Sequence, residues 1–213
     1  MNTNDFNYYF ILQNTGWNNT PLLINSHSKD KEMGLKLGLR FLYLAQEVPE
    51  GHVANLCFYE KVKNPYMDTD CLTVDCFNVF SKKVRDELEK HMPIKYLQLV
   101  PTVIEEGKYR YTDFYIPNMC QRIFTFDEKL SDYECIDEEF GSFENIKKIV
   151  LDREKLSKIP LEDRLVYVAH EDSQFRLYHE SIIDIIKSVN PVGMRIVRVE
   201  EWTSGALFDF MRE

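Results

Sequence analysis

The sequence is poor in the residues that break a chain or cross-link it. Its 213 residues include only eight glycines and eight prolines, which argues against long flexible linkers. The five cysteines are an odd number without a C-x-x-C pair, so we expect free thiols in a reducing compartment. A chain of this length can bury about 70% of its unfolded surface. Neither a disulfide nor a metal is therefore needed to hold a fold in which 44% of the residues are hydrophobic.

Long apolar runs and targeting signals are also lacking. The most apolar stretch, residues 37–45, is too short to cross a bilayer and contains Arg40. The first residues have neither the basic region nor the small-residue cleavage site of a signal peptide. We therefore expect a cytoplasmic protein that does not contact a membrane.

Basic residues are in deficit. The chain has 35 acidic residues against 26 Lys and Arg, for a net charge of -9. An acidic surface repels nucleic acid and anionic lipid, so we expect neither as a partner. The same balance suits a basic protein partner, although solubility alone also accounts for it.

No strong catalytic or metal-binding motif occurs in the sequence. It contains no Walker loop, no G-x-G-x-x-G and no G-x-S-x-G string. His179-Glu180 resembles the start of a zinc helix, but the position of the second ligand is Ile183, so the pair is expected to cap or flank a core helix. The polar tripeptide 170–172 is expected to be a turn. We therefore expect no enzyme, no metal and no cofactor.

Hydrophobic patterning predicts an α+β fold with mostly antiparallel sheets and a few short packed helices. Residues 1–72 are expected to be an N-terminal β-rich part of the same globule as an α+β core over 73–213. Ser81 is the expected cap of the first clear helix. The predicted strands are 6–13, 53–62, 76–80, 96–104, 109–117, 121–126, 146–152, 163–171, 174–179 and 194–202, and the predicted helices are 81–93, 153–159 and 180–191.

One supersecondary pattern occurs twice. A strand, a helix, a proline and a strand follow one another in 76–104 and again in 174–202. Both duplication and chance explain two copies. Aligning Pro93 with Pro191 pairs Phe80 with Tyr178, Val84 with Ile182 and Leu88 with Ile186.

The most unusual stretch by composition is 127–144, in which acidic residues far outnumber basic ones. Clustered carboxylates can steer a basic partner toward a surface, whereas a solvated loop is the simpler explanation. Trp17, Tyr66 and Trp202 lie near expected turns and are candidate aromatic anchors, with core packing as the alternative. The acidic residues predicted to contact a partner are Asp127, Glu128, Asp132, Glu134, Asp137, Glu138 and Glu139.

Several segments resemble a family of bacterial immunity proteins of polymorphic toxin systems, first catalogued as a domain of unknown function. They are a strand, Ser and short helix in 79–91, a strand running into Asp127 and Ser131 in 116–134, a strand with Leu-Asp in 146–156, and a closing strand–helix–Gly–strand unit in 175–202 with Gly193 as its glycine. Residues 7–12 look like the opening strand of the family, whereas 14–69 match nothing in it.

The resemblance implies a non-catalytic protein that binds and neutralises a cognate toxin domain in the cytoplasm of the producing cell. The toxin domain is expected to be basic, and a homodimer is left open. Two alternatives stand beside this interpretation. A small hydrolase or nuclease-like enzyme would show a deep polar pocket with several ionisable side chains, and an adaptor protein would have no toxin as partner.

Overall fold

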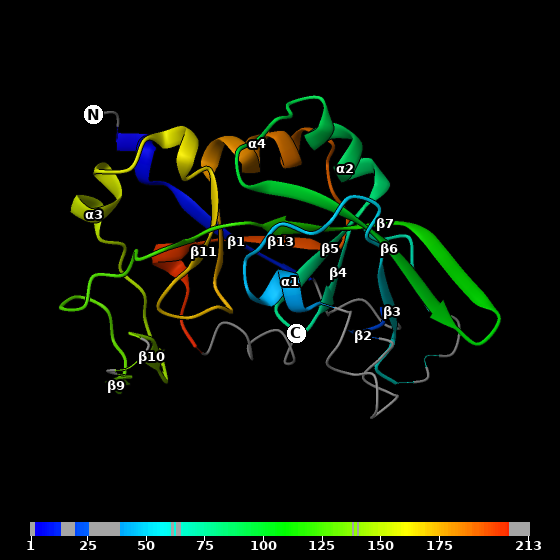
Figure 1. The fold of residues 1–213 in the computed structure, drawn as a ribbon, viewed down its shortest axis with the longest axis horizontal. Helices are drawn as coiled ribbons and strands as arrows, with labels where there is room; N and C mark the ends of the chain where they lie inside the picture. The colour runs from blue at the N-terminus through cyan, green and yellow to red at the C-terminus, as the bar shows by residue number, and fades with distance from the viewer. Residues whose placement is uncertain are drawn as a thin grey trace.

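Two β structures lie side by side and share helices across their junction (Figure 1). The computed structural model describes residues 3–13, 20–25, 39–60, 62, 65–137, 139 and 141–204. The long β6–β7 hairpin extends from one end of the molecule, and the short β9–β10 pair lies at the other end (Figure 1). The predicted α+β class with mostly antiparallel pairing is confirmed.

The first β structure is a closed barrel of six strands in the order β2-β3-β6-β7-β5-β4. Its interior is filled by apolar side chains such as Leu56, Leu72 and Ile116, with Leu42 of the short helix α1 (Arg40–Tyr43) packed among them. Closure leaves no free strand edge. The strands are β2 (Leu23–Asn25), β3 (Ala54–Phe58), β4 (Cys71–Val74), β5 (Phe77–Ser81), β6 (Leu97–Glu106) and β7 (Tyr109–Met119).

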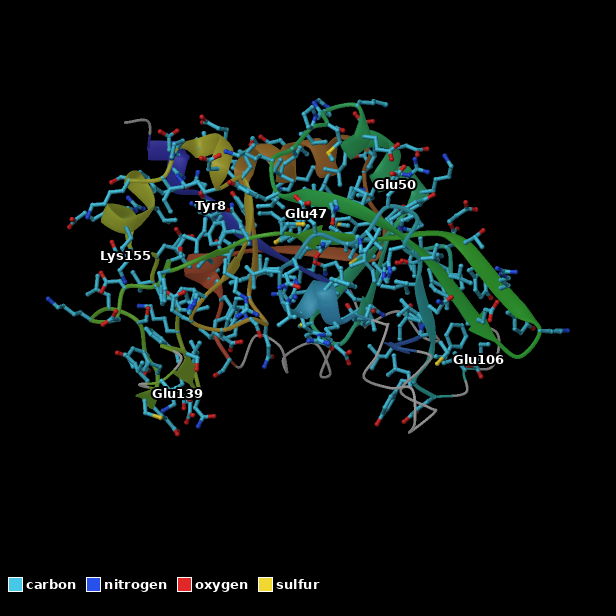
Figure 2. The ribbon with its side chains drawn as sticks, viewed as in Figure 1. Tyr8, Glu47, Glu50, Glu106, Glu139 and Lys155 are labelled. Atoms are coloured by element: carbon cyan, nitrogen blue, oxygen red, sulfur yellow. The ribbon has the colours of Figure 1, made fainter. Side chains whose placement is uncertain are left out.

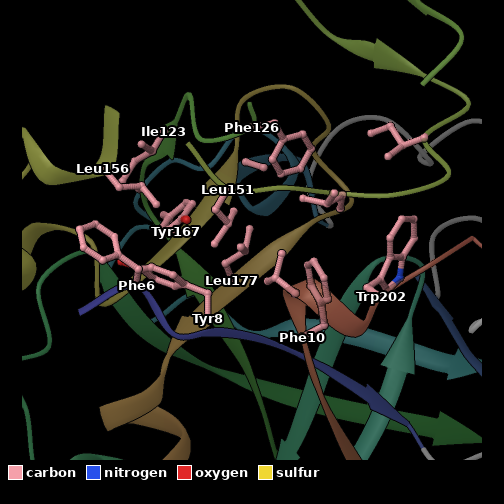
Figure 3. Packing of buried hydrophobic residues seen from close by; sticks show 14 of the residues in the cluster. Phe6, Tyr8, Phe10, Ile123, Phe126, Leu151, Leu156, Tyr167, Leu177 and Trp202 are labelled. Carbon is pink, nitrogen blue, oxygen red and sulfur yellow. The ribbon is translucent and has the colours of Figure 1, made fainter. Parts of the chain in front are cut away.

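The second β structure is a five-stranded sheet in the order β13-β1-β12-β11-β8. Its aromatic-rich cluster includes Phe10, Phe126 and Tyr167 together with Leu156 of helix α3 (Figure 3). The strands are β1 (Tyr8–Gln13), β8 (Arg122–Ile123), β11 (Val166–Ala169), β12 (Arg176–His179) and β13 (Met194–Arg198), and the neighbouring elements are α3 (Arg153–Ser157), β9 (Cys135–Ile136) and β10 (Phe143–Glu144). Short 3-10 turns span Thr3–Phe6, Leu161–Asp163 and Val199–Glu201.

Helices α2 (Lys82–Glu89) and α4 (Glu180–Ser188) lie together over the junction and share one hydrophobic cluster (Figure 1). They belong to the two strand–helix–strand units predicted from the sequence, β5–α2–β6 and β12–α4–β13. The aligned residues Phe80 and Tyr178 are in contact, with ring centroids 6.3 Å apart. Ser81 and His179, which follow them, are the N-caps of the two helices. The repeated pattern therefore places equivalent residues at the interface between the two units.

Several sequence expectations need correction. Residues 146–152 form isolated bridges rather than a strand, because Ile146, Ile149 and Leu151 turn inward at irregular spacing to reach the aromatic cluster. The segment 121–126 does not continue the meander, since only β8 is extended there and it pairs in parallel with β11. Strand β4 was not predicted. Apart from these corrections, residues 72 and 73 are neighbours within β4 (Cys71–Val74), and β1 pairs with β12 and β13.

Candidate functional site

The acidic segment 127–144, here called the acidic lobe, leaves the sheet after β8 and returns through β10. Its first turn is fixed by Asp127, whose Oδ1 accepts the backbone N–H groups of Lys129 and Leu130 at 2.8 and 3.1 Å. The lobe then runs to the β9–β10 pair, and Glu139 lies at its outer end (Figure 2). The carboxylates are thus carried on a projection away from the barrel.

Hydrogen bonds within the acidic lobe and to residues 145–148 give it a defined shape. The backbone N–H of Asp132 donates to the carbonyl of Lys148 at 2.9 Å. The side chain of Asn145 donates to Glu134 at 2.7 Å, and the N–H of Glu139 donates to Asp137 Oδ1 at 2.8 Å. The last two bonds hold the carboxylates of Glu134 and Asp137 in place before any partner arrives, which reduces the entropy lost on binding.

Glu171, in the turn between β11 and β12, anchors both ends of the acidic lobe. Its Oε1 accepts the backbone N–H groups of Thr125 at 2.6 Å and Phe126 at 2.7 Å. Its own carbonyl accepts the N–H of Phe143 at 2.8 Å. The side chain is 2% exposed, and burial raises the pKa of its carboxyl group although the two N–H donors oppose that rise. Sequence analysis placed this residue only in a polar turn.

The predicted carboxylates differ in exposure and in what they contact. Asp127 and Asp137 are half-buried, and both cap local turns. Lys155 Nζ lies 3.6 Å from Glu128 Oε1, so one basic side chain of α3 borders the acidic lobe (Figure 2). Glu138 lies outside the described residues. Exposed carboxylates of the acidic lobe are Glu128, Asp132, Glu134, Glu139 and Glu144.

Two exposed apolar side chains lie at the acidic lobe, Leu130 within its first turn and Phe124 next to Gly141. Phe124 is 50% exposed, and its ring stacks on the imidazole of His170 with centroids 3.8 Å apart. Leu130 is 63% exposed in the first turn of the acidic lobe. Sequence reasoning missed both, because alternation in 121–126 marks Phe124 only as the residue facing away from Ile123.

The two predicted aromatic anchors that the structure describes, Tyr66 and Trp202, do not join this surface. Trp202 was wrongly taken for an exposed anchor, because it is buried against Phe175 and Phe10 with centroids 4.8 and 6.1 Å away (Figure 3). The structure therefore has the alternative interpretation for Trp202, which was core packing. Tyr66 is half-buried and lines a separate pocket of about 590 Å³ together with Lys82 and other residues of β7 and α2. Trp17 lies outside the described residues.

A larger pocket, with a volume of about 850 Å³, lies where the barrel meets the sheet. It is here called the junction pocket. Its walls come from β1, the β4–β5 turn and the β11–β12 turn, with Tyr43 of α1. Apolar walls are provided by Phe10, Phe175 and Trp202, and polar walls include Asp75, Cys76, Asn78, Asp172 and Arg176.

Arg176 is the most buried ionisable group of the junction pocket, at 5% exposure. Its Nη1 donates to the carbonyl of Ser173 at 2.7 Å and lies 3.1 Å from the sulfur of Cys76. The guanidinium stacks on Phe77 at 3.9 Å from the ring centroid. Its other terminal nitrogen, Nη2, is buried without a hydrogen-bond partner, and no carboxylate of the described residues lies within ion-pair distance of it.

The enzyme alternative predicts ionisable side chains in a deep pocket, so the protonation states of Cys76 and Tyr43 bear on it. Burial raises the pKa of the Cys76 thiol, and the nearby Arg176 offsets only part of that rise. Burial, with a hydrogen bond to Asp75, likewise raises the pKa of Tyr43. Both groups are therefore neutral at pH 7, and no histidine stands among the described residues of the wall. The arrangement suits binding better than nucleophilic attack.

His179 has the structural place expected for it. Its Nδ1 accepts the N–H of Ser181 at 3.2 Å and caps α4, which confirms the prediction that the His-Glu pair flanks a core helix. Within the described ranges no group of three His, Cys, Asp or Glu side chains could hold a metal ion. No helix in the part of the chain that the structure describes has both the length and the apolar character of a membrane span.

Comparisons with protein-family models and with curated proteins find no match to this chain.

Proposed function

We propose that this chain is a non-catalytic immunity protein that binds a basic toxin domain through the acidic lobe. The observation that carries the proposal is a projecting, hydrogen-bonded lobe with exposed carboxylates, at which the apolar side chains of Phe124 and Leu130 are exposed as well. The resemblance of several segments to immunity proteins supports the same function. In this proposal the producing cell's cytoplasm is where the two proteins meet.

Long-range attraction would come from the carboxylates. Electrostatic steering raises association rates by about 10- to 1000-fold for complementary charges at low salt. The attraction is screened over about 8 Å at physiological ionic strength, so the most exposed groups contribute most. Glu139 at the outer end of the acidic lobe is in the best position to act first (Figure 2).

Lasting affinity would come from the apolar side chains. Interface energy concentrates in a few aromatic or large side chains that a charged rim shields from water. Phe124 fits this role because its ring is held flat against His170 and needs little further ordering. Burial of Phe124 and Leu130 under a partner would add their apolar area to the electrostatic attraction.

The proposal is tested by a growth assay with the toxin domain encoded by the neighbouring gene. The protein is co-expressed as wild type and as Glu128→Lys/Asp132→Lys/Glu139→Lys, three acidic residues whose side chains do not cap the turns of the acidic lobe. A matched control, Glu50→Lys/Glu105→Lys/Asp184→Lys, makes the same charge change on exposed residues elsewhere. We expect the wild type and the control to rescue growth and the lobe variant to fail.

A binding measurement distinguishes the mechanism from the function. We expect the association rate of the lobe variant with the purified toxin domain to fall about tenfold or more at low salt. Rescue by all three forms would retain the immunity function and contradict the acidic lobe as its site. Rescue by none of them would contradict the immunity function and favour the adaptor or enzyme alternatives.

A further inference from the structure

The junction pocket holds two opposite charges that do not meet. Arg176 and Asp172 both line it, four positions apart in the chain, yet they form no ion pair within 4.0 Å. A buried cation without a carboxylate partner is costly, and a nearby residue could have closed the pair at little cost. The open arrangement therefore needs an explanation beyond packing.

Local contacts use only part of the hydrogen-bonding capacity of the Asp172 carboxylate and the Arg176 guanidinium. Asp172 uses Oδ1 to accept the N–H of Gln174 at 2.8 Å, and burial raises the pKa of its carboxyl group, against which Arg176 acts. Arg176 braces the β11–β12 turn and the β4–β5 turn through Nη1, while Nη2 has no acceptor. Asp172 thus lines the shared cavity with one carboxylate oxygen held by a local hydrogen bond, and Arg176 lines the same cavity with Nη2 covered and without a hydrogen-bond partner.

The remaining walls define what could lie between the charges. Phe10, Phe175 and Trp202 form an apolar cluster, with the rings of Phe175 and Trp202 edge to face at 4.8 Å. Asp75 lies on the opposite strand turn with its carboxylate accepting the hydroxyl of Tyr43. A volume of about 850 Å³ falls within the range of small-molecule sites. The pocket therefore offers one cation, two carboxylates and an aromatic wall.

We propose that the junction pocket binds a small zwitterion of the α-amino-acid class with an aromatic or large apolar side chain. Its carboxylate lies on the Arg176 side, and its ammonium lies between Asp172 and Asp75. The side chain of the ligand packs on the wall formed by Phe10, Phe175 and Trp202. A simple anion fits less well because two carboxylates share the pocket, and a simple cation fits less well because of Arg176.

Three matched probes test this proposal by calorimetry on the full chain. L-Phenylalanine carries both charges, 3-phenylpropionate lacks the ammonium, and phenethylamine lacks the carboxylate. We expect saturable binding of L-phenylalanine, about tenfold or more tighter than binding of either analogue, which corresponds to the loss of one charged contact. No saturable binding below about 10 mM, or an analogue that binds as tightly as L-phenylalanine, would overturn it.

A substitution at Asp172 tests whether its carboxylate holds the ammonium group of the ligand. Asp172→Asn keeps the acceptor for Gln174 and removes the charge, so its fold is retained more readily than that of an Arg176 variant. We expect it to weaken L-phenylalanine about tenfold while leaving 3-phenylpropionate unchanged. Asp184→Asn on α4 is the control and should change neither. Equal weakening of both probes by Asp172→Asn would overturn the assigned orientation and, with it, the zwitterion.

Discussion

Replacing Glu171 tests whether one buried carboxylate holds the acidic lobe to the sheet. The side chain is 2% exposed and accepts two backbone N–H groups, those of Thr125 and Phe126, which are themselves fully buried. Glu171→Ala removes the acceptor and leaves two donors without a partner. Glu171→Gln keeps an acceptor oxygen for these two N–H groups, removes the charge, and puts an NH2 group in the place of Oε2, which is buried without a hydrogen-bond partner.

The size of the effect follows from the hydrogen bonds. A buried donor left unsatisfied costs about 1–3 kcal/mol, so the alanine variant, which leaves two, should lose about 2–6 kcal/mol of unfolding free energy. That is a large share of the stability of a typical domain, about 5–15 kcal/mol. The glutamine variant should stay within about 1 kcal/mol of the wild type at pH 7, because the weaker neutral hydrogen bonds are offset by not burying a charge.

The pH dependence has a definite sign. Burial raises the pKa of Glu171 in the folded state above its unfolded value, which is about 4.3. The folded protein therefore holds this proton more tightly than the unfolded chain does. The stabilising contribution is fully present below the unfolded pKa and is lost as the pH rises through the folded pKa. Glu171→Gln lacks this loss, so its stability relative to the wild type should increase as the pH rises above about 4.3, the unfolded pKa, and through the raised folded pKa.

Urea unfolding of the three proteins at several pH values provides the measurement. Amide hydrogen exchange of Phe143, whose N–H donates to the Glu171 carbonyl, reports separately on the attachment of the acidic lobe. The reasoning is refuted if Glu171→Ala unfolds within about 0.5 kcal/mol of the wild type. It is also refuted if the advantage of the glutamine variant grows as the pH falls.

Two further substitutions separate structural residues from the proposed sites. His179→Ala should cost about 1–2 kcal/mol of unfolding free energy, because it removes the α4 cap. The variant should still neutralise the toxin. Loss of neutralisation in a folded variant would contradict this expectation. Gly193→Ala should destabilise the protein by more than about 2 kcal/mol, because Gly193 has φ +71° and a Cβ there would lie 2.1 Å from Thr69 Oγ1. Thermal unfolding measures this loss. Gly107→Ala is the control, since Gly107 also has a positive φ but has open space around it.

Local signals in the sequence predicted the local parts of the fold. The helix at α2 followed from Ser81 and from apolar residues at helical spacing, and the structure has that cap. The barrel could not be predicted in this way, because it closes through parallel pairing of β2 with β4 and of β3 with β6. Those pairings join segments far apart in the chain, and their strands carry no distinctive local pattern.

The candidate sites likewise include a part that local sequence could predict and a part that depends on tertiary contacts. Composition alone marked the acidic lobe, since carboxylate density is visible without a fold. Trp202 was a candidate anchor because it lies near an expected turn, whereas the structure has the alternative, with Trp202 packed in the aromatic cluster after β13. Arg176 was missed, because in the sequence it is only one residue of a short strand. Its burial depends on the meeting of β12 with the β4–β5 turn.

The two proposed sites share one short turn of the chain. Glu171 and His170 face the acidic lobe, through hydrogen bonds to 125–126 and a ring stack with Phe124. Asp172 and Arg176, from the same turn, face the junction pocket. A ligand that orders this turn would also order the anchor of the acidic lobe, and any resulting coupling of affinities must be equal in both directions. Variants at the outer carboxylates and at Asp172 therefore probe the two sites separately, whereas a change at Glu171 disturbs both.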